Sequence, residues 1–386
     1  MKIETFYYTK KDGWSIKNFP EMDSENTLVL LFCDPEYIND PTPIDQIAKS
    51  YPKSKIMGCS TAGVIFDSNI LDGIISVAVL RFEKTQLEIS QHSIESAEDS
   101  LRVGKEITQK LLKPELRGIF ILSEGTKING TDLVKGMAEA TPLNKNIIIT
   151  GGLAGDGIHF KKTWVIYQGK ILLNAVVAVG FYGDHIQIGH AAYGGWDIFG
   201  PERVITRSDK NTLYELNEQP ALELYKRYLG EKAAGLPSTG LLYPLAIRKN
   251  SDDQHILVRT ILGVDEKEQS LTFAGEMPLG YSAQLMRANF DRLIMSAGEA
   301  GVAARKMITS KETNDPNHVI SIAVSCVGRR LILGERTEEE TESVLESLPP
   351  GTKQIGYYSY GEISPFSDGT CDLHNQTMAL TLLYES

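Results

Sequence analysis

Short apolar runs alternate along this chain with segments of helical spacing, and this alternation limits the folds that it can adopt. Continuous apolar runs at Thr27–Phe32, Ile74–Leu80 and Ile119–Leu122 are typical of buried strands. Ser100–Leu112 and Gly130–Ala140 have the spacing of amphipathic helices. Strand–helix–strand alternation predicts an α/β fold, in which mixed sheets are flanked by helices.

The middle of the chain carries a hairpin signal and then a change of pattern. Asn146–Thr150 is a further predicted strand, and Trp164–Tyr167 and Ile171–Gly180 flank a Gln-Gly pair that is typical of a tight turn. The pattern changes near Pro201, so we expect two lobes, residues 1–205 and residues 206–386. In the second lobe we predict helices at Thr212–Leu229, Tyr281–Ile308 and Thr337–Leu348, and strands at Leu241–Ile247, His255–Leu262, Val319–Ser325, Lys353–Tyr360 and Gln376–Leu383.

The two halves repeat one order of elements. A strand (FILS), a helix, a strand (NIIIT) and a hairpin that ends in NAVVAV correspond to IAVS, an acidic helix, QIGYYSY and a final strand that opens with NQTMAL. The pairs Ile121/Ile322 and Asn174/Asn375 are separated by the same interval. Either an internal duplication or the common order of any two α/β lobes explains this repetition.

Charge and cysteine usage narrow the class of protein. The net charge of −11 disfavours binding to a phosphate backbone or to an anionic membrane face. Apolar stretches such as residues 174–180 fall short of the ~20 residues that a membrane span needs. The four cysteines are far apart and the N-terminus has no signal-peptide core, so we expect a cytoplasmic protein with no disulfide framework.

From Thr27 to Tyr384 the chain resembles the FIST family, with its N-terminal and C-terminal segments. Each matching stretch is weak alone, but their order along nearly the whole chain is specific. The stretches are Cys59–Gly63, Gly151–Asp156, Gly195–Pro201, Val204–Thr206, Leu213–Asn217, Pro220–Leu222, Ser325–Arg329, Tyr360–Ile363 and Leu373–Thr377.

The resemblance implies a sensory module that binds a small ligand. FIST relatives occur fused or adjacent to kinases, cyclases and chemotaxis proteins, and one branch is described as haem-based nitric-oxide sensing. Because the two FIST segments fill this chain, we expect it to signal to a separate partner, such as a histidine kinase or a cyclase. A two-component system is one setting for such a pair.

The candidate ligand-binding residues follow predicted strands of the second lobe. In α/β sheets ligands collect where strand ends diverge into loops. Arg329 suits a carboxylate, Glu362 suits an amino group, and Asn375 can donate and accept, a set that fits an amino acid or similar small carboxylate. The full set is Cys326, Arg329, Tyr360, Glu362, His374, Asn375 and Asp156. Alternatively, Arg329 and Glu362 pair with each other, and His374 and Asn375 cap a turn.

Catalysis and metal binding have weaker signals. Cys326 and His374 are the residue types of a nucleophilic pair, but the sequence shows no third residue that would orient the histidine. We therefore predict no catalytic residue. An enzyme that uses Cys326 and His374 on a small substrate is the alternative. The GCSTA segment at residues 58–62 lacks the last glycine of a nucleophile elbow, so it favours a buried turn. The GGLAGDG segment favours a tight crossover over a phosphate cradle, because a hairpin rather than a helix follows it.

The seven histidines lack the spacing of a zinc site, so we predict no metal site. Haem needs only one axial ligand on an apolar wall. His190 and His374 are the candidate donors, against the alternative that each is a structural residue. Trp196–Phe199 either line a pocket or pack between the lobes.

Overall fold

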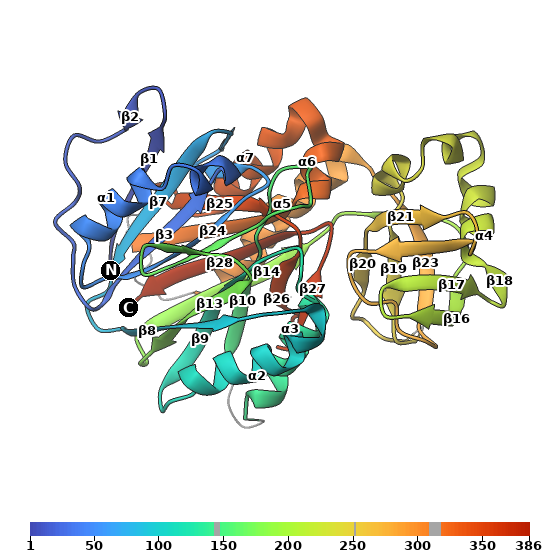
Figure 1. Cartoon of the computed structure of the whole chain (residues 1–386), viewed down its shortest axis with the longest axis horizontal. Coiled ribbons are helices and arrows are strands. Elements are labelled where there is room, and N and C mark those ends of the chain that lie inside the picture. Colours follow the sequence, from blue (N-terminus) through green and yellow to red (C-terminus); the bar gives the residue numbers. More distant parts are fainter. Residues whose placement is uncertain (143–146, 251, 309–317) are drawn as a thin grey trace.

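The computed structural model describes residues 1–142, 147–250, 252–308 and 318–386, so Asn146 of one predicted strand lies outside the described residues. A large lobe contains three mixed sheets with helices on their outer faces, and a small lobe containing a fourth sheet projects from it (Figure 1). The α/β architecture with two lobes is therefore confirmed. The helices are α1 (Thr42–Ser50), α2 (Ser100–Leu111), α3 (Gly130–Ala140), α4 (Ala221–Leu229), α5 (Phe290–Met307), α6 (Val327–Leu333) and α7 (Thr337–Ser347).

The three sheets of the large lobe mix strands from distant parts of the chain. Sheet 1 contains β1 (Lys2–Thr9), β2 (Gly13–Trp14), β3 (Thr27–Cys33), β4 (Lys55–Ser60), β7 (Ile74–Arg81), β11 (Val165–Tyr167) and β12 (Lys170–Leu172). Sheet 2 contains β8 (Gln86–Ser93), β9 (Leu116–Ser123), β10 (Ile148–Leu153), β13 (Ala175–Tyr182), β26 (Glu362–Pro365) and β27 (Cys371–His374). Sheet 3 contains β5 (Val64–Phe66), β6 (Asn69–Leu71), β14 (Ile186–Tyr193), β24 (Val319–Cys326), β25 (Lys353–Ser359) and β28 (Met378–Glu385).

One strand order is repeated in all three sheets. Each has a central parallel pair (β3 and β4, β9 and β10, β24 and β25), an antiparallel strand beside it (β7, β13, β28) and then a further strand (β1, β8, β14). On the other side of the parallel pair lies a hairpin from another repeat: β11–β12 in sheet 1, β26–β27 in sheet 2 and β5–β6 in sheet 3. The large lobe therefore consists of three repeats that exchange hairpins in a cycle.

Register along the repeats identifies equivalent residues. Leu31, Ile121 and Ala323 each pair with a glycine of the neighbouring parallel strand, where a Cβ atom would lie within 2.1 Å of backbone oxygen. Ile121 therefore corresponds to Ala323, one residue beyond the partner expected from sequence, and Asn174 corresponds to Gln376. The glycines are Gly58, Gly151 and Gly356.

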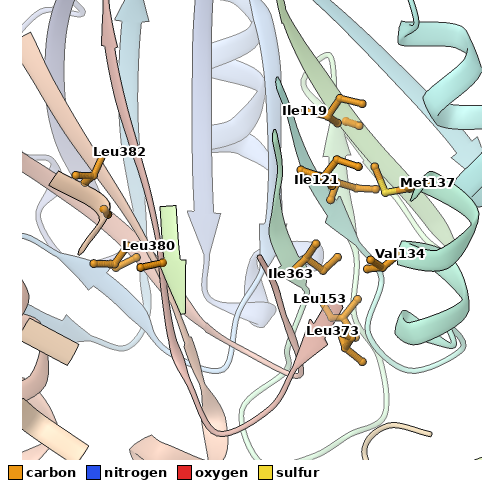
Figure 2. Packing of buried hydrophobic residues seen from close by; sticks show 14 of the residues in the cluster. Ile119, Ile121, Val134, Met137, Leu153, Ile363, Leu373, Leu380 and Leu382 are labelled. Carbon is orange, nitrogen blue, oxygen red and sulfur yellow. The ribbon is translucent and has the colours of Figure 1, made fainter. Parts of the chain in front are cut away.

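The exchanged hairpins share a core with the helices that cover the sheets. In Figure 2, Val134 and Met137 of α3 face Ile121 of β9, and Leu373 of the donated β27 lies in the same cluster. All four side chains are at most 2% exposed. Burying such side chains is worth roughly 1.5–3 kcal/mol each, so a donated hairpin contributes to the core of its host sheet.

The small lobe is an insertion between β14 and α5. Its strands are β15 (Asp197–Ile198), β16 (Arg203–Asp209), β17 (Thr212–Leu216), β18 (Gln219–Pro220), β19 (Leu245–Arg248), β20 (Leu257–Arg259), β21 (Ile261–Asp265), β22 (Ser270–Phe273) and β23 (Ser282–Arg287). The expected lobe division at residues 205 and 206 falls inside β16.

Two predicted helices begin with strands instead. In Thr212–Leu229 the helix begins only at Ala221, because Asn217 and Glu218 adopt positive φ and turn β17 into β18. Leu213 and Leu216 fit a helical spacing as well as a strand, which explains the error. In Tyr281–Ile308 the first residues form β23, and Asn289 caps α5 by accepting from Arg292 N.

Candidate functional site

A cavity of about 490 Å³, here called the junction pocket, lies between the large and small lobes. From the large lobe, the segments after β9, β10 and β25 line it, together with α6, which begins directly after β24. Segments at the ends of β20 and β22 line it from the small lobe. The lining residues are Ala97, Gly125–Gly130, Leu153, Phe160, Lys210, Asn211, Pro237, Ser238, Leu241, Thr260–Leu262, Phe273–Glu276, Cys326–Gly328, Leu331, Tyr360 and Asn375.

Three predicted site residues, Cys326, Tyr360 and Asn375, line the junction pocket. Asn375 is wholly buried, and its Nδ2 donates to the carbonyl of His374 at 3.1 Å. Among the described residues, Asn375 Oδ1 and Thr260 Oγ1 make no hydrogen bond. Buried polar atoms are normally paired, but these two oxygens are enclosed by protein and are not open to the cavity.

Cys326 ends β24, and the buried carboxyl of Glu362 lies near it. Glu362 accepts from Ser359 Oγ at 2.6 Å and from Thr377 Oγ1 at 2.9 Å, and it does not line the junction pocket. Burial raises the pKa of Glu362 to about 8. Burial also raises the pKa of the Cys326 thiol, which therefore carries its proton at neutral pH.

Asp156 and Tyr360 hold a loop over the pocket rather than facing a ligand directly. Tyr360 Oη donates to an Asp156 carboxylate oxygen and accepts from Phe160 N at 3.2 Å. The other Asp156 oxygen accepts from Lys161 N and Lys162 N, at 3.0 and 2.8 Å. The Phe160 and Tyr360 rings stack with centroids 4.2 Å apart, so this network positions Phe160 at the pocket wall.

Arg329 is wholly buried and bound to protein groups. It forms an ion pair with Glu340 at 2.8 Å and donates to the carbonyls of Gly194 and Leu293, both at 2.7 Å. Its partner is thus Glu340, not Glu362. The fold does not bring Arg329, Glu362 and Asn375 together around one cavity.

His190 and His374 line a second cavity, of about 380 Å³, between β14 and the small lobe. His374 Nε2 lies 2.9 Å from the carbonyl of Ser364, and burial lowers the pKa of both imidazoles. His190 Nδ1 makes no hydrogen bond in the part of the chain that the structure describes. Because His374 lines this cavity and Cys326 lines the junction pocket, the two do not share a pocket as a catalytic pair would.

The glycine-rich and cysteine-containing turns are packed inside the protein. Gly151 adopts φ +141, and its Cβ would lie 1.9 Å from the oxygen of Ile121. A Cβ on Gly155 would lie 2.8 Å from Ala62 N. Cys59 is wholly buried in β4, and Ser60 Oγ accepts from Trp164 N. Both segments thus occupy tight crossovers between repeats.

Within residues 1–142, 147–250, 252–308 and 318–386, no group of three or more His, Cys, Asp and Glu side chains is arranged to hold a metal ion. Nor does any helix within those ranges have the length and apolar character needed to cross a membrane.

Comparison with known proteins gives the family. The FIST N domain model matches residues 27–219, and the FIST C domain model matches residues 221–365. The chain belongs to the FIST family. FIST domains are generally sensory domains of signal transduction that bind small ligands.

Other comparisons add little to the FIST assignment. No curated protein matches this chain. The crystal structure of cyanuric acid hydrolase from A. caulinodans aligns with 78% of this chain and 99% of its own at 11% identity, but its TM-score of 0.18 establishes no shared fold.

Several pocket residues of this FIST protein had no signal in the sequence. Thr260, Phe273 and Glu276 belong to the small lobe, and only the docking of that lobe brings them to the loop after β9 and to the start of α6. Asn129 is the one of these pocket residues that the sequence could have indicated, because an asparagine directly before a predicted helix is a common N-cap. It caps α3 and also donates to Glu276 at 3.2 Å, which links the two lobes.

Proposed function

We propose that this FIST protein is a cytoplasmic sensor that binds an amino acid or a similar small carboxylate in the junction pocket. The observation that carries the proposal is a cavity of about 490 Å³ with largely apolar walls that both lobes form. Clefts of this composition between lobes are common sites for small ligands. Lys127 and Lys210 line the pocket and supply positive charge for a carboxylate.

In this proposal, a change in the relative position of the two lobes couples ligand binding to signalling. A ligand that contacts both lobes favours the conformation in which they are closed, because it binds that conformation better. The changed surface is then presented to a separate partner, such as a histidine kinase or a cyclase.

The first test is a thermal-shift screen of the purified protein against amino acids and small carboxylates. A ligand that binds only the folded state raises the unfolding midpoint, by about 2.7 kcal/mol of stability at a hundredfold excess over Kd. Small-angle scattering with a hit should then show a smaller radius of gyration. An unchanged radius at saturation contradicts lobe closure, and the absence of any hit contradicts the sensor function.

A second candidate function, haem-based gas sensing, is favoured by the cavity that contains His190 and His374. The imidazoles of His190 and His374 line this cavity beside the apolar side chains of Met286 and Met307, a setting that suits an axial imidazole on an apolar wall. Haem bound there would supply an iron centre for a diatomic gas. An absorption spectrum of the protein incubated with haem tests this, and a Soret band that His190→Ala does not alter excludes His190 as the ligand.

A further inference from the structure

We infer that the small carboxylate bound in the junction pocket has a planar aromatic body, which stacks on the Phe160 ring. The ligand class is therefore an aromatic amino acid or an aryl carboxylate. This inference rests on the proposed small-ligand function, and it makes Phe160 the residue that selects among ligands.

The loop that carries Phe160 is the longest of three equivalent connections. Residues 154–164 join β10 to the hairpin that follows it, whereas residues 61–63 and 360–361 make the same connection in the other two repeats. Phe160 lines the junction pocket from this loop. Because extended loops on a rigid scaffold commonly carry binding residues, the extra length indicates a function beyond joining two strands.

Hydrogen bonds hold this loop in one conformation. Asp156 is 5% exposed, and its carboxylate accepts from Lys161 N and Lys162 N at 3.0 and 2.8 Å. Tyr360 Oη donates to the same carboxylate and accepts from Phe160 N at 3.2 Å. Phe160 has φ +51, a conformation that bulky residues rarely adopt. Such strain persists only where the surroundings hold it, so these bonds fix Phe160 at the pocket wall.

The Phe160 ring keeps surface for a second flat group. It stacks on Tyr360 with centroids 4.2 Å apart and 15° between the ring planes, so Tyr360 covers one face. Phe160 is nevertheless 46% exposed, whereas Tyr360 is 7% exposed. A planar ligand in the pocket therefore extends the stack from the Phe160 ring.

The other walls fit an aromatic body with one charged end. Leu153, Ile261 and Phe273 line the pocket and bury apolar surface of the ligand. Lys127 and Lys210 also line it and supply the positive charge for a carboxylate. A stacked pair adds about two- to tenfold in affinity beyond the apolar area that it buries, so ring planarity rather than size decides the preference.

Two matched pairs of probes test the aromatic body. L-Phenylalanine is compared with L-cyclohexylalanine, and benzoate with cyclohexanecarboxylate, by titration calorimetry. The saturated rings are at least as apolar, so burial of area alone does not favour the aromatic member. In each pair that binds, the aromatic member should bind about two- to tenfold more tightly. Equal or tighter binding of the saturated member, or no binding of any of the four, overturns the inference.

Matched variants locate the stack. Phe160→Leu keeps an apolar side chain and removes the ring, so the ratio of aromatic to saturated affinity should fall to about one. Phe160→Tyr should keep the wild-type ratio. Phe290→Leu is the control, because Phe290 is 39% exposed at the start of α5 and does not line the junction pocket. A wild-type ratio in Phe160→Leu overturns the role of Phe160.

A further variant tests how Phe160 is positioned. Tyr360→Phe keeps the stacked ring and removes the hydroxyl that accepts from Phe160 N. The ratio of affinities should fall, since the loop loses the bond that holds Phe160. A purely structural effect would weaken both members of a pair alike, so an unchanged ratio contradicts the positioning role of Tyr360.

The outcomes separate this inference from the proposed function. Binding of aliphatic amino acids or aliphatic carboxylates alone overturns the aromatic body and leaves the sensor function intact. No binding by any amino acid or small carboxylate overturns both. Unfolding midpoints of the variants without probe show whether each one is folded.

Discussion

At the residue scale, Glu362 departs most from its equivalents in the other repeats. By register it corresponds to Val64 and Val165, which are buried and apolar. A carboxyl in this apolar position is held by Ser359 and Thr377, and burial favours its protonated form. The sequence indicated a polar residue after a strand, but only the fold makes Glu362 a wholly buried acid.

Glu362→Gln should change how stability depends on pH. The pKa of Glu362 is raised from 4.5 to about 8, so between these values the folded state holds a proton that the unfolded state has lost. Wild-type stability should therefore fall, relative to the variant, as the pH rises from about 4.5 to about 8, and the difference should then level off. Urea unfolding at several pH values measures this. A constant difference would mean that Glu362 is ionised throughout.

At the element scale, close contacts within the parallel strand pairs hold each repeat together. Gly356 of β25 lies against β24 so closely that a Cβ would be 1.9 Å from the oxygen of Ala323. Gly58 and Gly151 have the same role in the other two pairs. The hairpin after each of these strands then leaves for another sheet, so a shift of one strand disturbs two sheets.

Gly356→Ala should destabilise the protein markedly, by about 1–3 kcal/mol, because backbone must move to admit the methyl group. Gly263→Ala is the control. A Cβ at Gly263 meets only Thr272, at 3.9 Å, and should change stability by less than about 1 kcal/mol. Denaturant midpoints compare the two variants, and equal losses would contradict the close approach of β24 and β25.

At the scale of the whole molecule, the small lobe packs against the large lobe, and the junction pocket lies between them. Arg259 is central to this arrangement, since it is wholly buried and binds the carbonyls of Glu276 and Leu373 at 3.1 and 3.0 Å. The hydrogen bond from Asn129 Nδ2 to the Glu276 carboxylate also joins the two lobes.

Arg259→Met should weaken lobe docking by about 2 kcal/mol, because two buried carbonyls lose a charged donor. We expect a larger radius of gyration in small-angle scattering and weaker binding of any ligand of the junction pocket. Arg207→Met is the control, since Arg207 is 55% exposed and pairs with Glu215 within the small lobe. A radius equal to that of the control would show that other contacts are sufficient for docking.

The sequence by itself determined the α/β class, most strands and the helices α2, α3 and α7, because their apolar spacing is local. Three of the ligand-binding candidates that it suggested, Cys326, Tyr360 and Asn375, lie at strand ends that line the junction pocket, and their role in binding stays a prediction. Only the tertiary structure decided the threefold exchange of hairpins, the pairing of Arg329 with Glu340, and the junction pocket that residues of both lobes line. These depend on which distant elements pack together, and no local spacing encodes that choice.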